Sequence, residues 1–179
     1  MKYIFDFDNV LFHTSKHFKE HLFITLGEVG ISRNSAQEYY NKEHWNQFSL
    51  KKMLAYLSVA EDLYEKIMNR NQFFLNKELL EIIRKMKSSD CYIVTYGDEE
   101  FQSDKIKRCG ISHLFSEIII VSGSKKGAIE KLCAKHKYEQ VIFIDDKAQH
   151  FEDLDFIKFP NLKTILYDEN GMEKLKAKI

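Results

Sequence analysis

The first twelve residues read MKYIFDFDNVLF (residues 1–12), an apolar run that ends in two aspartates and is followed, after one asparagine, by three more apolar residues. A β-rich run bounded by polar residues is typical of a strand that is buried on both faces. Asp6 and Asp8 stand where this strand is expected to end, and in extended chain their side chains would leave on the same side. Two carboxylates held so close repel each other unless a cation or a shared proton relieves them. The stretch therefore predicts a buried strand with an acidic site at its carboxyl end.

The composition sets the first limits on the class of protein. The chain has 179 residues, enough for one domain or for one core with a modest insertion. Hydrophobic residues make up 44% of it, and 27 basic residues balance 27 acidic ones. This balance predicts no general attraction to nucleic acid or to an acidic membrane surface. No segment approaches the length of a membrane span, and the two aspartates interrupt the apolar run that a signal peptide would need.

The cysteines indicate the compartment. Cys91, Cys109 and Cys133 are an odd number and lack the spacing of metal ligands. They suit free thiols in a reducing environment. We therefore expect a cytoplasmic protein, a monomer or a small homo-oligomer, with neither nucleic acid nor a membrane as a partner.

Helical periodicity replaces the strand signals between residues 13 and 89. Five helices are predicted here, of which the second and third could be capped by Ser32 and Ser49. The fifth, at residues 78–87, leads back to the next strand. A single helix would suffice to connect two parallel strands, so the extra helices need an explanation of their own.

Further strands are predicted at residues 91–95, 117–121, 141–144 and 162–167. The first of them ends in Thr95, followed by Tyr96 and Gly97, and a hydroxyl and backbone N–H groups at a strand end can donate to an anion. An ordinary Thr-initiated turn is the alternative interpretation. The third ends in a pair of acids, Asp145 and Asp146.

The order of these features resembles the four motifs of the haloacid dehalogenase-like (HAD) hydrolases. The first motif is matched by Asp6 and Asp8, the second by Thr95 at its strand end, and the fourth by Asp145 and its neighbour. A lysine at the start of the helix after residue 121 corresponds to the third motif. The resemblance covers residues 1 to about 146 and implies a capped, phosphatase-type member of the family.

The resemblance also implies an architecture. The fold would be α/β, a doubly wound five-stranded parallel sheet with the strand order 5-4-1-2-3. Residues 1–13 and 75–179 would form this core, and residues 14–74 a helical cap over the active site that excludes water while admitting substrate. The site would lie at the carboxyl ends of the strands, near the topological switch point.

Roles for the site residues follow from the same resemblance. Asp6 would be the nucleophile, and Asp8 the general acid/base. The substrate phosphate would be bound by Thr95, Tyr96, Gly97 and the motif-three lysine. Hard oxygen ligands suit Mg²⁺, and those implied are Asp6, the backbone carbonyl of Asp8, Asp145 and Asp146.

Two adjacent lysines compete for the third motif. The helix after them carries an apolar stripe of Ile129, Leu132, Cys133 and His136. At about 100° per residue, Lys125 lies about 30° from the centre of this stripe and Lys126 about 70° away on the other side. Because the stripe packs on the sheet, Lys125 would point toward the strand ends. Many relatives have glycine directly after the lysine, which favours Lys126 with Gly127. We expect Lys125 to act, with Lys126 as the alternative.

The predicted function is Mg²⁺-dependent hydrolysis of a small phosphorylated metabolite through an aspartyl-phosphate on Asp6. The second aspartate argues against the dehalogenase branch of the family. Alternatives are a phosphomutase, a catalytically silent HAD-fold binding protein, and a receiver domain, whose shorter chain carries its phosphorylated aspartate in the middle.

Some positions depart from the family pattern. His13 stands where many capped relatives have an acid, and Tyr96 where asparagine is frequent, so the substrate is left open. Four aromatic side chains of the helical region either line a pocket or belong to the core or surface of the cap: His17, His21, His44 and Trp45.

Overall fold

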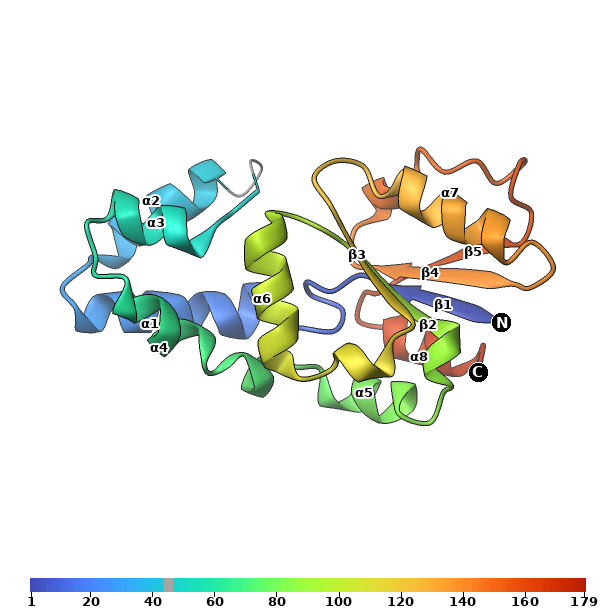
Figure 1. Cartoon of the computed structure of the whole chain (residues 1–179), viewed down its shortest axis with the longest axis horizontal. Helices are drawn as coiled ribbons and strands as arrows, with labels where there is room; N and C mark the ends of the chain where they lie inside the picture. The colour runs from blue at the N-terminus through green and yellow to red at the C-terminus, as the bar shows by residue number, and fades with distance from the viewer. Residues whose placement is uncertain (44–46) are drawn as a thin grey trace.

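A five-stranded parallel sheet forms the centre of the computed structural model, which describes residues 1–43 and 47–179 (Figure 1). Its strands are β1 (Lys2–Phe5), β2 (Cys91–Tyr96), β3 (Glu117–Val121), β4 (Val141–Asp145) and β5 (Leu162–Leu166). Their order in the sheet is β3-β2-β1-β4-β5, and every neighbouring pair is parallel. The predicted fold class and strand order are confirmed.

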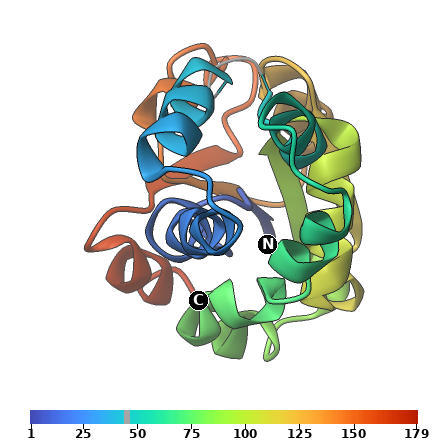
Figure 2. The same cartoon turned by 90° about the vertical axis from the view of Figure 1, so that its left-hand side faces the viewer.

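The α-helices of the described residues are α1 (Lys19–Glu28), α2 (Arg33–Glu43), α3 (Leu50–Tyr56), α4 (Asp62–Met68), α5 (Lys77–Ile83), α6 (Glu99–Cys109), α7 (Lys126–Lys135) and α8 (Gly171–Lys176). In Figure 1, α7 covers one face of the sheet, and α5 and α8 lie against the other. Helices α1–α4 stand together beyond α6, at the left of Figure 1, and Figure 2 looks at them from that side. None of the helices in the described ranges has the length and apolar character needed to cross a membrane.

Side chains of β1 alternate between two hydrophobic clusters. Tyr3 and Phe5 belong to the larger cluster, which includes the apolar faces of α5 and of the helices at the left of Figure 1. Ile4 belongs to the smaller cluster, which includes Ile129 and Leu132 of α7. Because both faces of β1 are buried, the strand needs an apolar residue at nearly every position, as its sequence has.

The strand ends earlier than the sequence suggested. β1 stops at Phe5, and the amide groups of Leu11 and Phe12 both donate to the carbonyl of Phe7, closing a tight turn. Asn9 adopts a φ of 60° within it. The apolar residues after the aspartates are buried in this turn and do not continue the strand. The prediction that the chain is extended through Asp8 is therefore wrong.

The helical region begins with a π-helical turn, Thr14–Phe18, that runs into α1. Ser32 caps α2, since its hydroxyl accepts a hydrogen bond from the amide of Ser35 at 3.1 Å. Ser49 precedes α3 without a side-chain capping bond, so that part of the prediction is wrong. Helix α5 ends at Ile83, earlier than predicted.

Candidate active site

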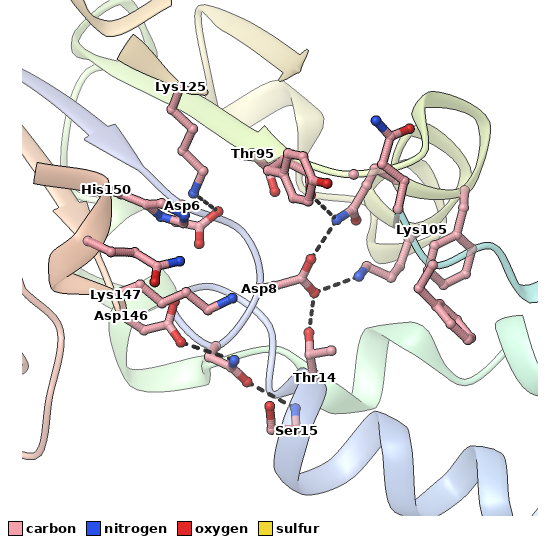
Figure 3. Close-up of a pocket in the computed structure, with 18 of the residues that line it drawn as sticks. Asp6, Asp8, Thr14, Ser15, Thr95, Lys105, Lys125, Asp146, Lys147 and His150 are labelled. Carbon is pink, nitrogen blue, oxygen red and sulfur yellow. Dashed lines mark hydrogen bonds and ion pairs between the residues drawn. The ribbon is translucent and has the colours of Figure 1, made fainter. Parts of the chain in front are cut away.

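A pocket opens at the carboxyl ends of β1, β2 and β4, where open α/β sheets bind ligands. Its cavity has a volume of about 330 Å³. The sheet side of the wall contains Asp6, Thr95 and Lys125, and the helical region contributes Tyr40 and Phe48. Figure 3 shows the side chains of the sheet side converging on this space.

The centre of the sheet side is a buried ion-pair group. The ammonium of Lys125 lies 2.8 Å from Oδ1 of Asp6 and 2.6 Å from Oδ2 of Asp145. The amide of Phe7 also donates to Oδ1 of Asp6, at 2.7 Å. Burial raises the pKa of Asp6 to about 7, since the nearby charges of Asp145 and Asp8 add to the effect of burial and the charge of Lys125 only partly offsets it.

The two candidate lysines lie in different surroundings. Lys125, the residue before α7, is 3% exposed and points at the strand ends. The side chain of Lys126 is 42% exposed, and its ammonium lies 3.8 Å from Glu130 and 2.5 Å from the carbonyl of Asp153. The geometry thus places Lys125 beside Asp6, while its catalytic role stays a prediction.

We expect replacement of Lys125 by Met to lower turnover and stability together. Removing the ammonium leaves Asp6 and Asp145 buried without their cation, which costs about 3–5 kcal/mol of unfolding free energy for a broken buried pair. Lys126→Met is the matched control and should change neither quantity much, because exposed pairs contribute only about 0–1 kcal/mol. Chemical denaturation and steady-state kinetics on both variants measure this. Greater loss of turnover in Lys126→Met would reverse the assignment.

The two acids at the end of β4 are held in place by different donors. Asp145 accepts from Nδ1 of His150 at 2.8 Å and from the amide of Lys147 at 2.9 Å. Burial by itself would raise the pKa of Asp145, but the bond from His150 and the charge of Lys125 hold it below its usual range. Burial and the charge of Asp145 raise the pKa of Asp146, which accepts from the side-chain amide of Asn9 at 3.1 Å.

Three carboxylates are placed where they could hold a metal ion. Asp6, Asp145 and Asp146 each offer one oxygen, and these oxygens lie within 4.8 Å of one another. All-oxygen donors fit a hard cation such as Mg²⁺. A cation here would also relieve the repulsion from Asp145 and Asp8, which adds to the effect of burial in raising the pKa of Asp6. The residues present therefore fit a magnesium site.

The side chain of Asp8 belongs to a separate network and not to this group of oxygens. Its Oδ1 accepts from the hydroxyl of Thr14 and, at 2.6 Å, from the ammonium of Lys105, while its Oδ2 accepts from Nε2 of Gln102 at 2.5 Å (Figure 3). Burial would raise the pKa of Asp8, but the charge of Lys105 and these three bonds outweigh burial and lower it. For Asp8, only the backbone carbonyl was expected as a metal ligand, so its side chain is available for other chemistry.

The predicted phosphate-binding segment also lines the pocket. Thr95 is 1% exposed, and within the part of the chain that the structure describes its hydroxyl has no hydrogen-bond partner. Leaving such a group unpaired costs about 1–3 kcal/mol, which a bound oxyanion would offset. Tyr96 is half-buried in the same wall.

Gly97, the third residue of the predicted segment, lines the same pocket. Its amide already donates to the carbonyl of Val121 at 3.0 Å, so in this conformation it does not offer its N–H to a phosphate. Its φ of 151° disfavours other residues, and an added Cβ would come within 3.0 Å of the side chain of Gln102. Gly97 thus leaves room for the side chain that binds Asp8.

Several pocket residues were not foreseen from the sequence. Gln102 and Lys105 are three residues apart on one face of α6, the helix that starts directly after the Thr95 strand. That spacing is the one signal that could have singled them out. Of the aromatic residues considered, His17 and His21 do not line the pocket, and His44 and Trp45 lie outside the described residues.

Comparisons with known proteins bear on the family of this chain. The family model of the haloacid dehalogenase-like hydrolases matches residues 3–153. A comparison with curated proteins gave no significant match.

Solved structures share the fold at low sequence identity. A candidate HAD-like hydrolase from Burkholderia xenovorans LB400 is 15% identical, with a TM-score of 0.69 over 95% of this chain and 86% of that one. A candidate HAD-hydrolase, YfnB from Bacillus subtilis, was solved with bound magnesium and is 15% identical. Its TM-score is 0.54, and the match covers 92% of this chain and 85% of that one. A candidate phosphatase from Clostridium difficile is 16% identical, with a TM-score of 0.55, and the match covers 98% of this chain and 89% of that one. With the four motifs in order along the matched residues, this chain belongs to the haloacid dehalogenase-like hydrolases.

Proposed function

We propose that the protein is a Mg²⁺-dependent phosphoric monoester hydrolase that acts on a small phosphorylated metabolite through an aspartyl-phosphate on Asp6. The observation that carries the proposal is the buried hydroxyl of Thr95, unpartnered among the described residues, in one pocket with Asp6 and Lys125. A nucleophile, a cation and an open hydroxyl donor are the groups that a transferring phosphoryl group needs. Membership of the family and the resemblance to a candidate phosphatase support the same conclusion.

The first chemical step would transfer the phosphoryl group to the protein. A carboxylate oxygen of Asp6 attacks phosphorus in line, and the bond from phosphorus to the leaving oxygen breaks. Asp8, carrying the proton that it accepts from water in the second step of the preceding turnover, gives that proton to the leaving oxygen. Lys125 and Thr95 stabilise the charge on the phosphoryl oxygens.

The second step would return the protein to its starting state. The oxygen of a water molecule attacks phosphorus, the bond from phosphorus to Asp6 breaks, and Asp8 accepts the proton of the water. A magnesium ion held by Asp6, Asp145 and Asp146 would supply charge neutralisation for the phosphate and orient it toward Asp6.

A colorimetric assay tests this proposal directly. Purified protein should release inorganic phosphate from para-nitrophenyl phosphate in the presence of Mg²⁺, and a panel of phosphorylated metabolites should then identify the preferred substrate. Transfer of the phosphoryl group to another hydroxyl of the substrate without net release of phosphate would indicate a mutase. No turnover of any phosphoester would leave a binding protein of the HAD fold.

Residues 14–74 are proposed to act as the cap that selects the substrate. Tyr40 and Phe48 of this region line the pocket, and their rings are 4.9 Å apart. The ring of Phe48 also lies 5.4 Å from that of Phe101 on α6, which belongs to the proposed core. An aromatic wall opposite the acids would contact the part of the substrate that leaves, and not its phosphate.

We expect Phe48→Ala to change which phosphoester is preferred without abolishing turnover of a small one. Loss of one large contact should alter the ratio of kcat/KM values between a bulky and a small substrate by about tenfold or more. Phe73→Ala, which removes an exposed ring of the same helical region, is the matched control. An unchanged ranking of substrates in a folded Phe48→Ala variant would contradict the assignment of this region as a specificity cap.

The compartment and the assembly state also remain predictions. Cys91, Cys109 and Cys133 are free and buried, as thiols in a reducing compartment would be. We keep the cytoplasm as the proposed location and a monomer or small homo-oligomer as the proposed state.

A further inference from the structure

Lys105 is an unusual residue in this site, because its charge is buried away from water. It lies on α6, its side chain is 2% exposed, and among the described residues its ion-pair partner is Asp8. Its ammonium lies between 5.1 and 5.9 Å from the ring centres of Phe7, Phe12, Phe18 and Phe101. A lysine is almost never buried so fully unless it is paired, and aromatic faces attract a desolvated cation. Asp8 and the four rings therefore form a specific buried site for one ammonium group.

The donors around Asp8 leave it little freedom. A carboxylate has about four acceptor sites, and three of them are filled here. Oδ1 takes the bonds from Lys105 and Thr14, and Oδ2 takes the bond from Gln102. Two donors come from α6 and one from the start of the helical region, so the carboxylate is held from two directions. About one acceptor site remains open, and it belongs to Oδ2.

The open part of Asp8 faces the pocket. Its side chain is 25% exposed, against 2% for Lys105, and Asp8 lines the cavity that also holds Asp6 and Thr95. In Figure 3 the dashed bonds to Lys105 and Thr14 run away from Asp6. The network thus anchors one side of the carboxylate and leaves the other available to a water or a leaving oxygen.

We propose that Lys105 is a positioning residue, which fixes Asp8 so that its one open acceptor site on Oδ2 receives the proton of the attacking water. This inference rests on the proposed hydrolase function. In the step concerned, the bond from water oxygen to phosphorus forms and the bond from phosphorus to Asp6 breaks. The proton of the water passes to Oδ2 of Asp8, and inorganic phosphate leaves. Without Lys105, Asp8 turns among several orientations, and this step slows.

The choice of substrate lets the experiment isolate that step. Para-nitrophenolate is a good leaving group that departs without a proton from Asp8, so the first step with para-nitrophenyl phosphate depends little on how Asp8 is held. Hydrolysis of the aspartyl-phosphate still needs a base. A variant defective in positioning Asp8 should therefore release one equivalent of para-nitrophenolate rapidly and then stall with phosphate on Asp6.

Lys105→Met is the main variant, since methionine keeps most of the length and packs well against aromatic rings. We expect its steady-state turnover to fall by about tenfold or more, which is part of the rate enhancement that a general base contributes. Rapid-quench experiments should show a burst and more phosphorylated protein than in the wild type. Asp8→Asn should behave in the same way, and the double variant should be no slower than Asp8→Asn, because residues that act as a unit are non-additive.

Two further variants guard against a trivial effect on folding. Gln102→Leu removes the bond to Oδ2 without touching the buried cation, and it should show the same phosphorylated state to a smaller extent. Lys107→Met, an exposed lysine on the same helix, should change nothing. If Lys105→Met does not fold, Lys105→Leu, which also removes the ammonium and leaves an apolar side chain among the rings, takes its place in the same burst measurement.

The outcomes separate the two proposals. A wild type without Mg²⁺-dependent hydrolysis would overturn the proposed function and the inference with it. An active wild type, together with a folded Lys105→Met variant that keeps full turnover, would overturn the inference alone. So would a loss of turnover without extra phosphorylated protein, or losses in the Lys105 and Asp8 variants that multiply.

Discussion

Asp6→Asn should abolish phosphate release while the protein stays folded. A side-chain amide cannot form the phosphorylated intermediate, and loss of a catalytic nucleophile typically costs at least about 10³-fold in turnover. The substitution keeps the volume, and the amide oxygen of asparagine can still accept the bond from the Phe7 amide. Lys125 keeps Asp145 as its partner at 2.6 Å, so no buried cation is left unpaired.

Stability is the measurement that makes this result interpretable. Burial raises the pKa of Asp6 to about 7, which means that the folded protein stabilises its ionised form poorly. Exchange for a neutral isostere should therefore shift the thermal midpoint by no more than about 4 °C. Intact mass must show that the asparagine has not deamidated to aspartate. Asp62→Asn, an exposed carboxyl on α4, is the matched control and should retain full activity.

One outcome would contradict the assignment of the nucleophile. A folded Asp6→Asn variant with more than about a tenth of wild-type turnover would show that another group accepts the phosphoryl, or that water attacks directly. Trapping phosphate on Asp6 in the wild type, followed by peptide mapping, would distinguish these two cases.

Removal of divalent cations should have an effect of the same order. With chelator present we expect hydrolysis to disappear, and added Mg²⁺ should restore it, because the ion would neutralise charge that the lysine cannot offset alone. Asp146→Asn should raise the Mg²⁺ concentration needed for half-maximal turnover by about tenfold or more. Asp62→Asn again serves as the control, since its carboxyl is exposed on α4.

Thermal stabilisation by Mg²⁺ tests the same metal site without a measurement of turnover. An ion that binds only the folded protein stabilises it, by about 2.7 kcal/mol at a hundred times its dissociation constant. The thermal midpoint of the wild type should therefore rise with Mg²⁺, and that of Asp146→Asn should rise less at the same concentration. Full hydrolysis in chelator, or an equal thermal shift in both proteins, would refute a metal site at Asp6, Asp145 and Asp146.

The sequence alone was enough to predict the sheet. Buried parallel strands need apolar residues on both faces, and β1, β2 and β4 show that need as short, almost wholly apolar runs without helical periodicity. Strand order came from the family resemblance and not from the runs themselves. The polar residues after the runs, such as Thr95 and Asp145, indicated an edge with chemistry because parallel strands bring their carboxyl ends together.

The sequence predicted the local backbone geometry at that edge of the sheet less well. The run around Asp6 and Asp8 is as apolar after the aspartates as before them, so periodicity cannot tell a continuing strand from a buried turn. The turn forms because Leu11 and Phe12 bond back to Phe7 and pack in the core. At Gly97, only the tertiary structure shows that the amide is engaged by Val121 of the neighbouring strand.

The sequence by itself determined which residues form the strands and which acids follow them, because burial and strand periodicity act between near neighbours in the chain. Only the tertiary structure decided that Lys105 binds Asp8, across 97 positions of sequence. An isolated lysine in a charged helix predicts a solvated side chain. It becomes buried here because three phenylalanines from the first eighteen residues and one from α6 itself surround its ammonium, and the energy of that arrangement exists only after the chain has folded.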